Sequence, residues 1–289
     1  MKRKIIKSGF LEIHAAVFLF GFSGLFGKFL HCPSIVIVFG RTLFASVALL
    51  TIMAFTSGRM PFSVGKKAML VYAVQGTLLG AHWTSFFYSI QISTVTIGLL
   101  TFSTFPIFVT FMEPFFFREK LYSSDIVTAM TVFAGLVLVL PGFDFSKAPV
   151  KGAFYGIVAG FTFALLCLAN RKNVEKSHPI TVAFHQNFFA ALALVPFIFI
   201  LKPSLPGENE LFLLAALGIL CTALSHTLFI KSLIFIKAQT AGIITALEPL
   251  YGILLAFIIL GERPGLRTLA GGVIIIAANV AAGFLHKKK

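Results

Sequence analysis

The chain has 289 residues, of which 58% are apolar and only 12% are charged, and its formal net charge is +14. A soluble domain carries about twice that charged fraction, so most of this chain is expected to lie in lipid rather than in water. The Lys and Arg residues form short clusters between apolar runs, which argues against a nucleic-acid partner.

Ten apolar segments are long enough to cross a membrane, which takes about 20 mostly apolar residues in a helix. They are residues 10–30, 34–57, 67–90, 94–117, 122–141, 152–170, 179–201, 209–230, 238–260 and 266–286. No small-residue cleavage site follows the basic start, so residues 10–30 are taken as a span and not as a signal peptide. The connections are too short to hold a soluble domain. We predict an all-α integral membrane protein with ten transmembrane helices.

The orientation follows from the distribution of Lys and Arg between the two sides of the membrane. With ten crossings, 16 of the 24 lie on the side that holds both termini, five lie on the other side, and three lie within or at the ends of spans. Positively charged loops stay in the cytoplasm, so we expect both termini there. Short loops and the absence of retained targeting signals favour a bacterial inner (plasma) membrane.

One motif occurs twice, 143 residues apart. The stretch around Pro106 reads TFPIFVTFMEPFFFREK, and the stretch around Pro249 reads LEPLYGILLAFIILGER. Each half holds five spans, an odd number, so the second half (residues 147–289) is expected to be inverted relative to the first (residues 1–146). Inverted halves that exchange conformations produce alternating access, with a site between them.

The ten spans, the five-plus-five repeat and the segment LEPLYGILLAFIILGERPG resemble the EamA-type branch of the drug/metabolite transporter (DMT) superfamily. Halves of that family typically end the fourth helix with a proline, an apolar run and a Glu followed by a basic residue. Both halves match, from Pro106 to Glu119-Lys120 and from Pro249 to Glu262-Arg263. The resemblance covers essentially the whole chain and implies a transporter. It implies no particular substrate, since relatives move amino acids, purines, sugars, nucleotide derivatives and toxic compounds.

Glu248 is the acidic residue nearest the middle of a span, and it precedes the helix-breaking Pro249. A carboxylate there is costly unless it is paired or wet. It fits a residue that carries a coupling proton or binds a substrate ammonium group. The alternative is a buried, protonated Glu that hydrogen-bonds a neighbouring helix.

Arg41 lies within the second span, in the sequence FGRTLFA. A guanidinium group binds a carboxylate or phosphate through two parallel hydrogen bonds, which suits a substrate clamp. The alternatives are an ion pair with Glu262 or a structural role at a helix end, where the repeat partner falls near Gln186.

The third span combines aromatic and polar side chains. His82 and Phe86 share one helical face, Trp83 lies beside them, and His226 is the repeat equivalent of Trp83. This pattern fits a cavity for an amphipathic or aromatic solute, and it fits ordinary packing in a Phe-rich membrane protein equally well.

The first span repeats glycine at Gly21, Gly24 and Gly27, which permits close approach of another helix or of a ligand. Gly156 and Gly160 do the same in the sixth span. The predicted lining is completed by Phe18, Phe22 and Ser23 of the first span, Thr101 and Phe105 of the fourth, and Tyr251 of the ninth.

We therefore predict a transporter rather than an enzyme. It would move a small amphipathic metabolite by alternating access, with export or exchange of amino acids as the leading hypothesis. Transport is either downhill or coupled to a proton through Glu248. The alternative within transport is an importer or exchanger of a nucleotide-like or sulfonium metabolite such as S-adenosylmethionine. The alternative from another class is a membrane-embedded lipid-handling enzyme.

No cofactor or metal is expected, because the chain contains no P-loop, no HExxH cluster and no nucleophile elbow. The lipid bilayer and a small-molecule substrate are the expected partners. A monomer suffices, and a dimer is compatible with the sequence.

Overall fold

The computed structural model describes residues 2–56, 65–117, 120–140, 142, 144–173, 178–232, 235 and 244–286. Within these ranges every regular element is a helix. The first half contains α1 (Lys2–Ser23), α2 (Phe26–Phe29), α3 (Ser34–Thr56), α4 (Lys66–Ile92), α5 (Val95–Phe102), α6 (Phe105–Phe117) and α7 (Ser123–Val139). The second half contains α8 (Ala148–Asn173), α9 (Pro179–Leu201), α10 (Glu208–Gly218), the π-helix η1 (Ile219–Leu224), α11 (Ser225–Ser232), α13 (Glu248–Leu255), the π-helix η2 (Ala256–Leu260) and α14 (Leu266–His286).

The described part of each predicted span is mainly helical, and six helical segments of the described residues are both long and apolar enough to cross a membrane. They are Gly9–Phe29, Ser34–Phe55, Val95–Phe117, Ala148–Asn170, Pro179–Leu201 and Glu208–Ser232. Three further apolar helices are shorter: Ser123–Val139, Glu248–Leu260 and Leu266–Ala282. Residues 238–243 of the ninth predicted span lie outside the described residues. An all-helical membrane protein is therefore confirmed, whereas the number of ten spans stays a prediction.

The fourth and ninth predicted spans are interrupted at positions 143 residues apart. In the first half, residues 103–104 form a turn between α5 and α6. In the second half, residues 246–247 form a turn directly before α13. Pro106 and Pro249 follow these turns, and a proline has no N–H to continue the helical ladder. Broken helices at corresponding positions of two halves are a mark of a binding site in membrane transporters.

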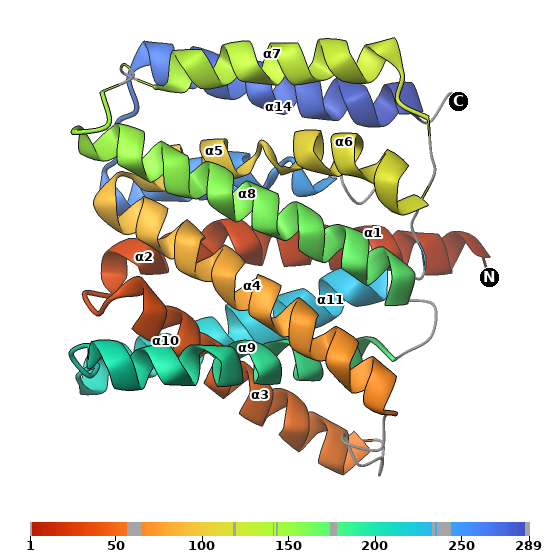
Figure 1. Cartoon of the computed structure of the whole chain (residues 1–289), viewed down its shortest axis with the longest axis vertical. Coiled ribbons are helices and arrows are strands. Elements are labelled where there is room, and N and C mark those ends of the chain that lie inside the picture. Colours follow the sequence, from red (N-terminus) through yellow and green to blue (C-terminus); the bar gives the residue numbers. More distant parts are fainter. Residues whose placement is uncertain are drawn as a thin grey trace.

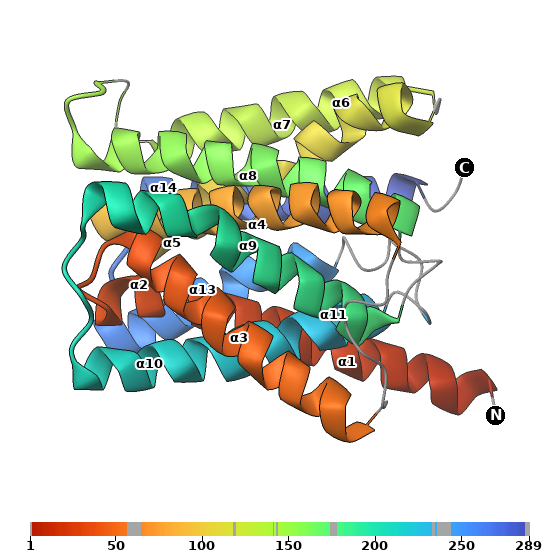
Figure 2. The same ribbon diagram turned by 60° about the horizontal axis from the view of Figure 1, so that its bottom comes forward.

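The helices pack in a reciprocal pattern (Figures 1 and 2). Helix α3 packs against α9, and α7 packs against α14, which pairs the second and fifth predicted spans of one half with those of the other. Several other contacts come in matched sets: α4 packs on α8 and α1 on α11, while α5 packs on α8 and α1 on α13. Helices α1 and α8, the first of each half, therefore lie at the centre of the bundle.

Glycines allow these central helices to approach closely. A methyl group added at Gly21 of α1 would lie 2.9 Å from both the Glu248 carbonyl oxygen and the Gly252 nitrogen of α13. A methyl group at Gly160 of α8 would lie 3.0 Å from the Phe102 carbonyl oxygen, at the end of α5. Both first helices thus pack backbone to backbone on the broken helix of the opposite half.

The bundle has two distinguishable ends. Helix α1 begins and α14 ends at the same end (Figures 1 and 2), which we call the N/C end. The connections between α2 and α3, between α4 and α5, between α9 and α10 and before α14 lie at the opposite end. An even number of crossings places the two termini on one side in this way.

Candidate functional site

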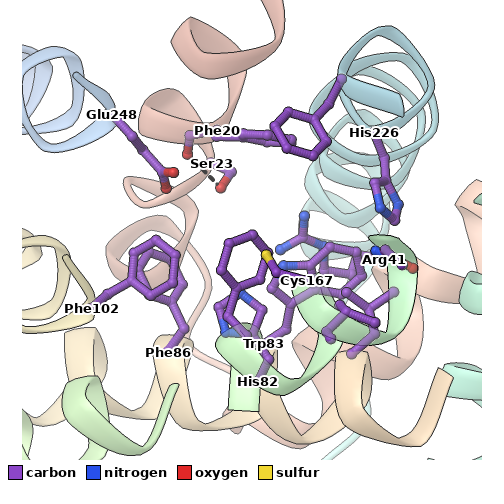
Figure 3. Close-up of a pocket in the computed structure, with 15 residues that line it drawn as sticks. Phe20, Ser23, Arg41, His82, Trp83, Phe86, Phe102, Cys167, His226 and Glu248 are labelled. Carbon is purple, nitrogen blue, oxygen red and sulfur yellow. Dashed lines mark hydrogen bonds between the residues drawn. The ribbon is translucent and has the colours of Figure 1, made fainter. Parts of the chain in front are cut away.

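A cavity lies between the two halves, beside the breaks in the fourth and ninth predicted spans (Figure 3). Its free volume is about 50 Å³, which is room for only a few water molecules. A metabolite therefore needs the helices to separate before it can enter. The lining residues are Phe20, Ser23, Arg41, Leu79, His82, Trp83, Phe86, Phe102, Phe163, Leu166, Cys167, Asn170, His226, Phe229 and Glu248.

Arg41 of α3 is 1% exposed and enters the cavity between aromatic rings. Its Nε donates to Oγ1 of Thr222 at 3.0 Å, and its Nη2 donates to the backbone oxygen of Cys221 at 3.4 Å. The guanidinium carbon lies 3.8 Å from the centroid of the Trp83 ring, a cation–π contact. The remaining nitrogen, Nη1, is buried and has no hydrogen-bond partner. The side chain is therefore held on three sides and keeps one charged donor unused.

The π-helix η1 places the residue that fixes Arg41. The Thr222 hydroxyl donates to the backbone oxygen of Leu217, five residues earlier, at 2.8 Å, and accepts from Arg41. Single π-helical turns inside α-helices are often found at functional sites. The local change of winding thus brings a hydroxyl group to Arg41 from the other half of the chain.

Glu248 is the first residue of α13 and is 6% exposed. Among the described residues, no ion pair involves its carboxylate. The helix N-terminus favours a negative charge at this position. In Figure 3, Glu248 and Arg41 approach the cavity from different sides. The site therefore presents an acidic and a basic group that do not neutralise each other by direct contact.

His82 connects the aromatic wall of the cavity to α8. Its Nδ1 lies 2.9 Å from the Ala159 backbone oxygen. A carbonyl oxygen can only accept, so Nδ1 donates, and the neutral ring then keeps Nε2 as an acceptor. The ring packs against Phe102 and Phe163, with centroids at 5.2 and 4.9 Å. Aromatic faces with few polar atoms suit an amphipathic ligand.

The structure brings seven of the twelve predicted lining residues together at this cavity. They are Ser23, Arg41, His82, Trp83, Phe86, His226 and Glu248. Their proximity fits a common site, while their role in binding stays a prediction.

Three predicted residues of the outer α1 face and of α13 lie elsewhere. Phe18 is 44% exposed, and its ring contacts Tyr251 edge-on with centroids 5.8 Å apart. Phe22 packs edge-on against Phe26 at 5.5 Å. Residues two positions apart on a helix point to nearly opposite sides, so Phe20 takes the cavity position instead of Phe18 or Phe22. We therefore place these three residues in helix packing.

The two predicted residues of the fourth span also lie behind the lining. Thr101 is fully buried, its hydroxyl donates to the Ile97 backbone oxygen at 2.7 Å, and it lies against Gly156 of α8. Phe105 stacks on Phe102 with ring centroids 5.4 Å apart. Phe102 lines the cavity and Phe105 supports it.

Four pairs of lining residues stand 143 positions apart. They are Phe20 with Phe163, Ser23 with Leu166, Trp83 with His226, and Phe86 with Phe229. The rings of Trp83 and His226 are in contact, with centroids 6.2 Å apart. The repeat spacing, applied to the lining positions of the first half, points to Phe163, Leu166 and Phe229, which the sequence analysis did not select. Leu79, Cys167 and Asn170 have no lining residue at this spacing.

A buried amide network adjoins the cavity on the α8–α9 side. Nε2 of Gln186 donates to Oδ1 of Asn170 at 2.6 Å and to Oε1 of Gln75 at 3.2 Å. Asn170 lines the cavity, whereas both glutamines are fully buried. Gln186, which lies near the repeat partner of Arg41, is therefore linked to the cavity through Asn170.

Carboxylates of the second half hold backbone groups of the first half at the opposite end of the bundle. Glu262 accepts hydrogen bonds from the backbone N–H of Val95 and Thr96, at 2.9 and 3.2 Å, and from the Thr96 hydroxyl at 3.1 Å. Glu210 accepts from the backbone N–H of His31 and Cys32, at 2.8 and 3.0 Å. An ion pair between Arg41 and Glu262 was one alternative for Arg41. It is wrong, because Glu262 instead caps the first turn of α5.

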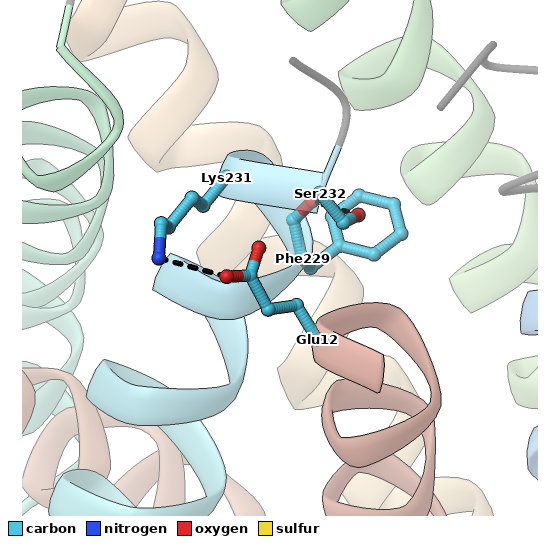
Figure 4. Close-up of polar contacts among 4 residues, drawn as sticks. All are labelled: Glu12, Phe229, Lys231 and Ser232. Atoms are coloured by element: carbon cyan, nitrogen blue, oxygen red, sulfur yellow. Dashed lines mark hydrogen bonds and ion pairs between the residues drawn. The ribbon is translucent and has the colours of Figure 1, made fainter. Parts of the chain in front are cut away.

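An exposed contact joins the halves toward the N/C end (Figure 4). Nζ of Lys231 on α11 lies 2.8 Å from Oε1 of Glu12 on α1. The Lys231 side chain is 49% exposed. The Glu12 side chain is 11% exposed. Half-exposed pairs contribute little in water, so we expect this contact to be weaker than those of Glu210 and Glu262, each of which accepts several hydrogen bonds from the first half.

No metal site is formed by the described residues, among which no three His, Cys, Asp or Glu side chains are grouped to hold an ion. The cavity is lined by aromatic rings, two leucines, one guanidinium group, one carboxylate, two imidazoles, one amide, one hydroxyl group and one thiol. These groups are able to bind and orient a small molecule.

Comparison with known proteins indicates a transporter. Two stretches of the chain, residues 7–140 and 150–282, match the model of the EamA-like transporter family. A protein described as an uncharacterized transporter of Bacillus subtilis (strain 168) is 26% identical over 283 residues, covering 96% of this chain and 90% of the relative. An S-adenosylmethionine uptake transporter of Rickettsia bellii (strain RML369-C) is 29% identical over 266 residues, covering 91% and 87%.

A solved crystal structure shares the fold over 98% of both chains, with a TM-score of 0.69 at 16% sequence identity. The family model covers nearly the whole chain in two copies, and the relatives that span it are transporters. The chain therefore belongs to the EamA-like transporter family of the drug/metabolite transporter superfamily.

Proposed function

We propose that this transporter moves a small amphipathic metabolite with both a positive and a negative group, by alternating access between two inverted halves. The observation that carries the proposal is the cavity between the halves, in which Arg41 and Glu248 are buried without an ion pair between them. A zwitterion supplies one opposite charge to each of these groups. Free amino acids are the leading class.

Alternating access is supported by the unequal ends of the bundle. The opposite end is tied by Glu210 and Glu262, whereas Glu12 and Lys231 join the halves toward the N/C end. The small volume of the cavity fits a conformation in which the route to the opposite end is closed. With the N/C end in the cytoplasm, as the distribution of Lys and Arg predicts, transport proceeds by breaking these contacts in turn.

S-adenosylmethionine is the second candidate, because several relatives similar over nine-tenths of the chain are named as uptake transporters of it. It also carries an α-amino-carboxylate, together with a sulfonium and an adenine ring. The aromatic wall formed by Trp83, Phe86 and Phe163 offers faces for such a ring. In this case the direction is import or exchange, whereas export or exchange is proposed for free amino acids.

The experiment is counterflow in proteoliposomes that contain the purified chain, with and without a pH gradient. The labelled panel holds amino acids, nucleosides and S-adenosylmethionine. We expect saturable uptake of members that carry an α-amino-carboxylate, and acceleration by the gradient if Glu248 carries a proton. Absence of counterflow for every member, in vesicles shown to hold folded protein, contradicts the proposed substrate class.

A further inference from the structure

Two neighbouring polar side chains in the cavity wall have unused hydrogen-bonding atoms. Nη1 of Arg41 and Nδ1 of His226 are both buried and without a partner. Both side chains pack on Trp83, the guanidinium at 3.8 Å and the imidazole ring at 6.2 Å between centroids. Buried polar atoms are nearly always hydrogen-bonded, so two unused groups on one wall of a cavity indicate a missing polar partner. The free Arg41 nitrogen can only donate, and Nδ1 of His226 donates in one tautomer of the ring.

The position of Arg41, a lining residue of the cavity, is fixed by groups that leave Nη1 without a partner. Thr222 and the Cys221 carbonyl take Nε and Nη2, and Trp83 covers one face of the guanidinium plane. The Cys221 carbonyl group and the Thr222 hydroxyl group both belong to the π-helix η1, which lies in the second half of the chain, whereas Arg41 lies in the first. A guanidinium held in this way is oriented before a ligand arrives, and pre-orientation lowers the cost of binding.

We propose that Arg41 and His226 form a carboxylate subsite and that Thr222 is its positioning residue. The inference rests on the proposed function, because it assigns one end of the substrate to one wall of the same cavity. Arg41 Nη1 and an imidazole N–H of His226 donate to the carboxylate of the substrate. A charge-assisted hydrogen bond from Arg to a carboxylate is about twice as strong as a neutral one.

Glu248 explains why the ligand is a zwitterion and not a simple anion. Its carboxylate lines the same small cavity, on a different side from Arg41 (Figure 3). When it is ionised, Glu248 would repel a substrate with negative charge alone. The cationic group of an amino acid or of a sulfonium compound lies toward Glu248 when its carboxylate lies at Arg41.

The labelling rate of Cys167 can be used to measure whether a ligand occupies this cavity. Cys167 lines it, whereas Cys32 and Cys221 are buried elsewhere. In a Cys32→Ser, Cys221→Ala background, a maleimide reacts with Cys167 alone, and a ligand in the cavity slows this reaction. Two pairs of probes differ only in the carboxylate: L-methionine with 3-(methylthio)propylamine, and S-adenosylmethionine with its decarboxylated form.

We expect the carboxylate member of at least one pair to protect Cys167 at a concentration at least about tenfold lower than its partner. Thr222→Val should reduce this ratio to less than about threefold, because the guanidinium loses the acceptor for Nε. Thr222→Ser keeps the hydroxyl and should restore the ratio. Thr227→Val is the matched control, because the Thr227 hydroxyl is buried without a partner and does not line the cavity.

The outcomes separate the two proposals. Equal protection by carboxylate and decarboxylated probes in the unmodified cavity overturns the subsite and leaves a transporter of cationic compounds. An unchanged ratio in folded Thr222→Val overturns the positioning role. No protection by any of the four probes, while the maleimide still reaches Cys167, overturns both the subsite and the proposed substrate class.

Discussion

The two halves that match the family model give the cavity similar backbones but different side chains. In both, the broken helix turns at an equivalent position, at residues 103–104 and 246–247, and is followed by a proline. In both, a glycine of the third span packs on the second span of the other half. A methyl group at Gly76 would lie 2.8 Å from the Gln186 carbonyl oxygen, and one at Gly218 would lie 2.7 Å from the Arg41 carbonyl oxygen.

The charged residues break this likeness. Arg41 in FGRTLFA corresponds to Gln186 in FHQNFFA, and Glu248 corresponds to Phe105, 143 residues earlier. Identical halves would bury two guanidinium groups or two carboxylates in one small cavity, and like charges there repel strongly. One basic residue from one half and one acidic residue from the other avoid this cost. The comparison teaches that the duplicated backbone forms the cavity, while the differences between the halves give it chemistry.

Glu248→Gln removes the acidic side of this asymmetry and should have the largest effect on activity. If Glu248 carries the coupling proton, flux driven by a pH gradient should fall by a factor of about 100 or more, because an amide does not bind and release a proton. Exchange of substrate for substrate needs no net proton movement and should persist. Both rates are measured in the same proteoliposomes.

Glu208→Gln provides the control, since Glu208 is exposed at the start of α10 and the same chemical change occurs there. Equal loss of gradient-driven flux and of exchange would rule out proton coupling through Glu248. Its role would then be binding of the substrate ammonium group.

The sequence predicted the helical membrane architecture because composition and segment length are sufficient for it. It predicted the facing of side chains less well. Lipid-facing and interior faces of a membrane helix are both apolar, so no amphipathic pattern distinguishes Phe18, which is 44% exposed, from Phe20, which lines the cavity. Polar residues were better guides, because Arg41, His82 and Glu248 avoid lipid and all line the cavity.

Contacts between segments that are distant in the chain could not be predicted from the sequence. Thr222 is 181 residues from Arg41, and its approach requires the π-helix η1, which has no reliable local sequence pattern. Pairing of Arg41 with Glu262 was reasonable on charge alone and is wrong. The carboxylate of Glu262 caps α5, where two backbone N–H groups and a hydroxyl group are available together.

The halves also differ in what they give to the opposite end, where the second half supplies carboxylates and the first half supplies N–H groups. Glu262→Gln tests this difference with a moderate expected effect. An amide accepts more weakly than a carboxylate and cannot accept at its nitrogen. The loss of about 1.4 kcal/mol that we expect corresponds to a roughly tenfold greater population of states open at that end.

The measurement uses a membrane-impermeant maleimide applied to the opposite end, with Cys167 as the only cysteine. Its labelling rate should rise by about fivefold to tenfold over the unmodified chain. Glu208→Gln serves again as the control, as an exposed carboxylate near the same end. An unchanged rate in folded Glu262→Gln would show that the cap on α5 stabilises both conformations equally.

Lys231→Met breaks the contact nearer the N/C end and should have the smallest effect of the three. The Lys231 ammonium group is half exposed and lies 2.8 Å from Glu12 (Figure 4). Exposed ion pairs contribute about 0–1 kcal/mol and are screened by salt, so the counterflow rate should change by less than about threefold. The difference from the unmodified chain should also shrink as salt is added. A larger change that persists at high salt would mean that Lys231 acts on the substrate or on the opening step itself. The two ends would then be held by contacts of similar strength, and the contrast between carboxylates that accept several hydrogen bonds and a single half-exposed ion pair would no longer explain which end is closed.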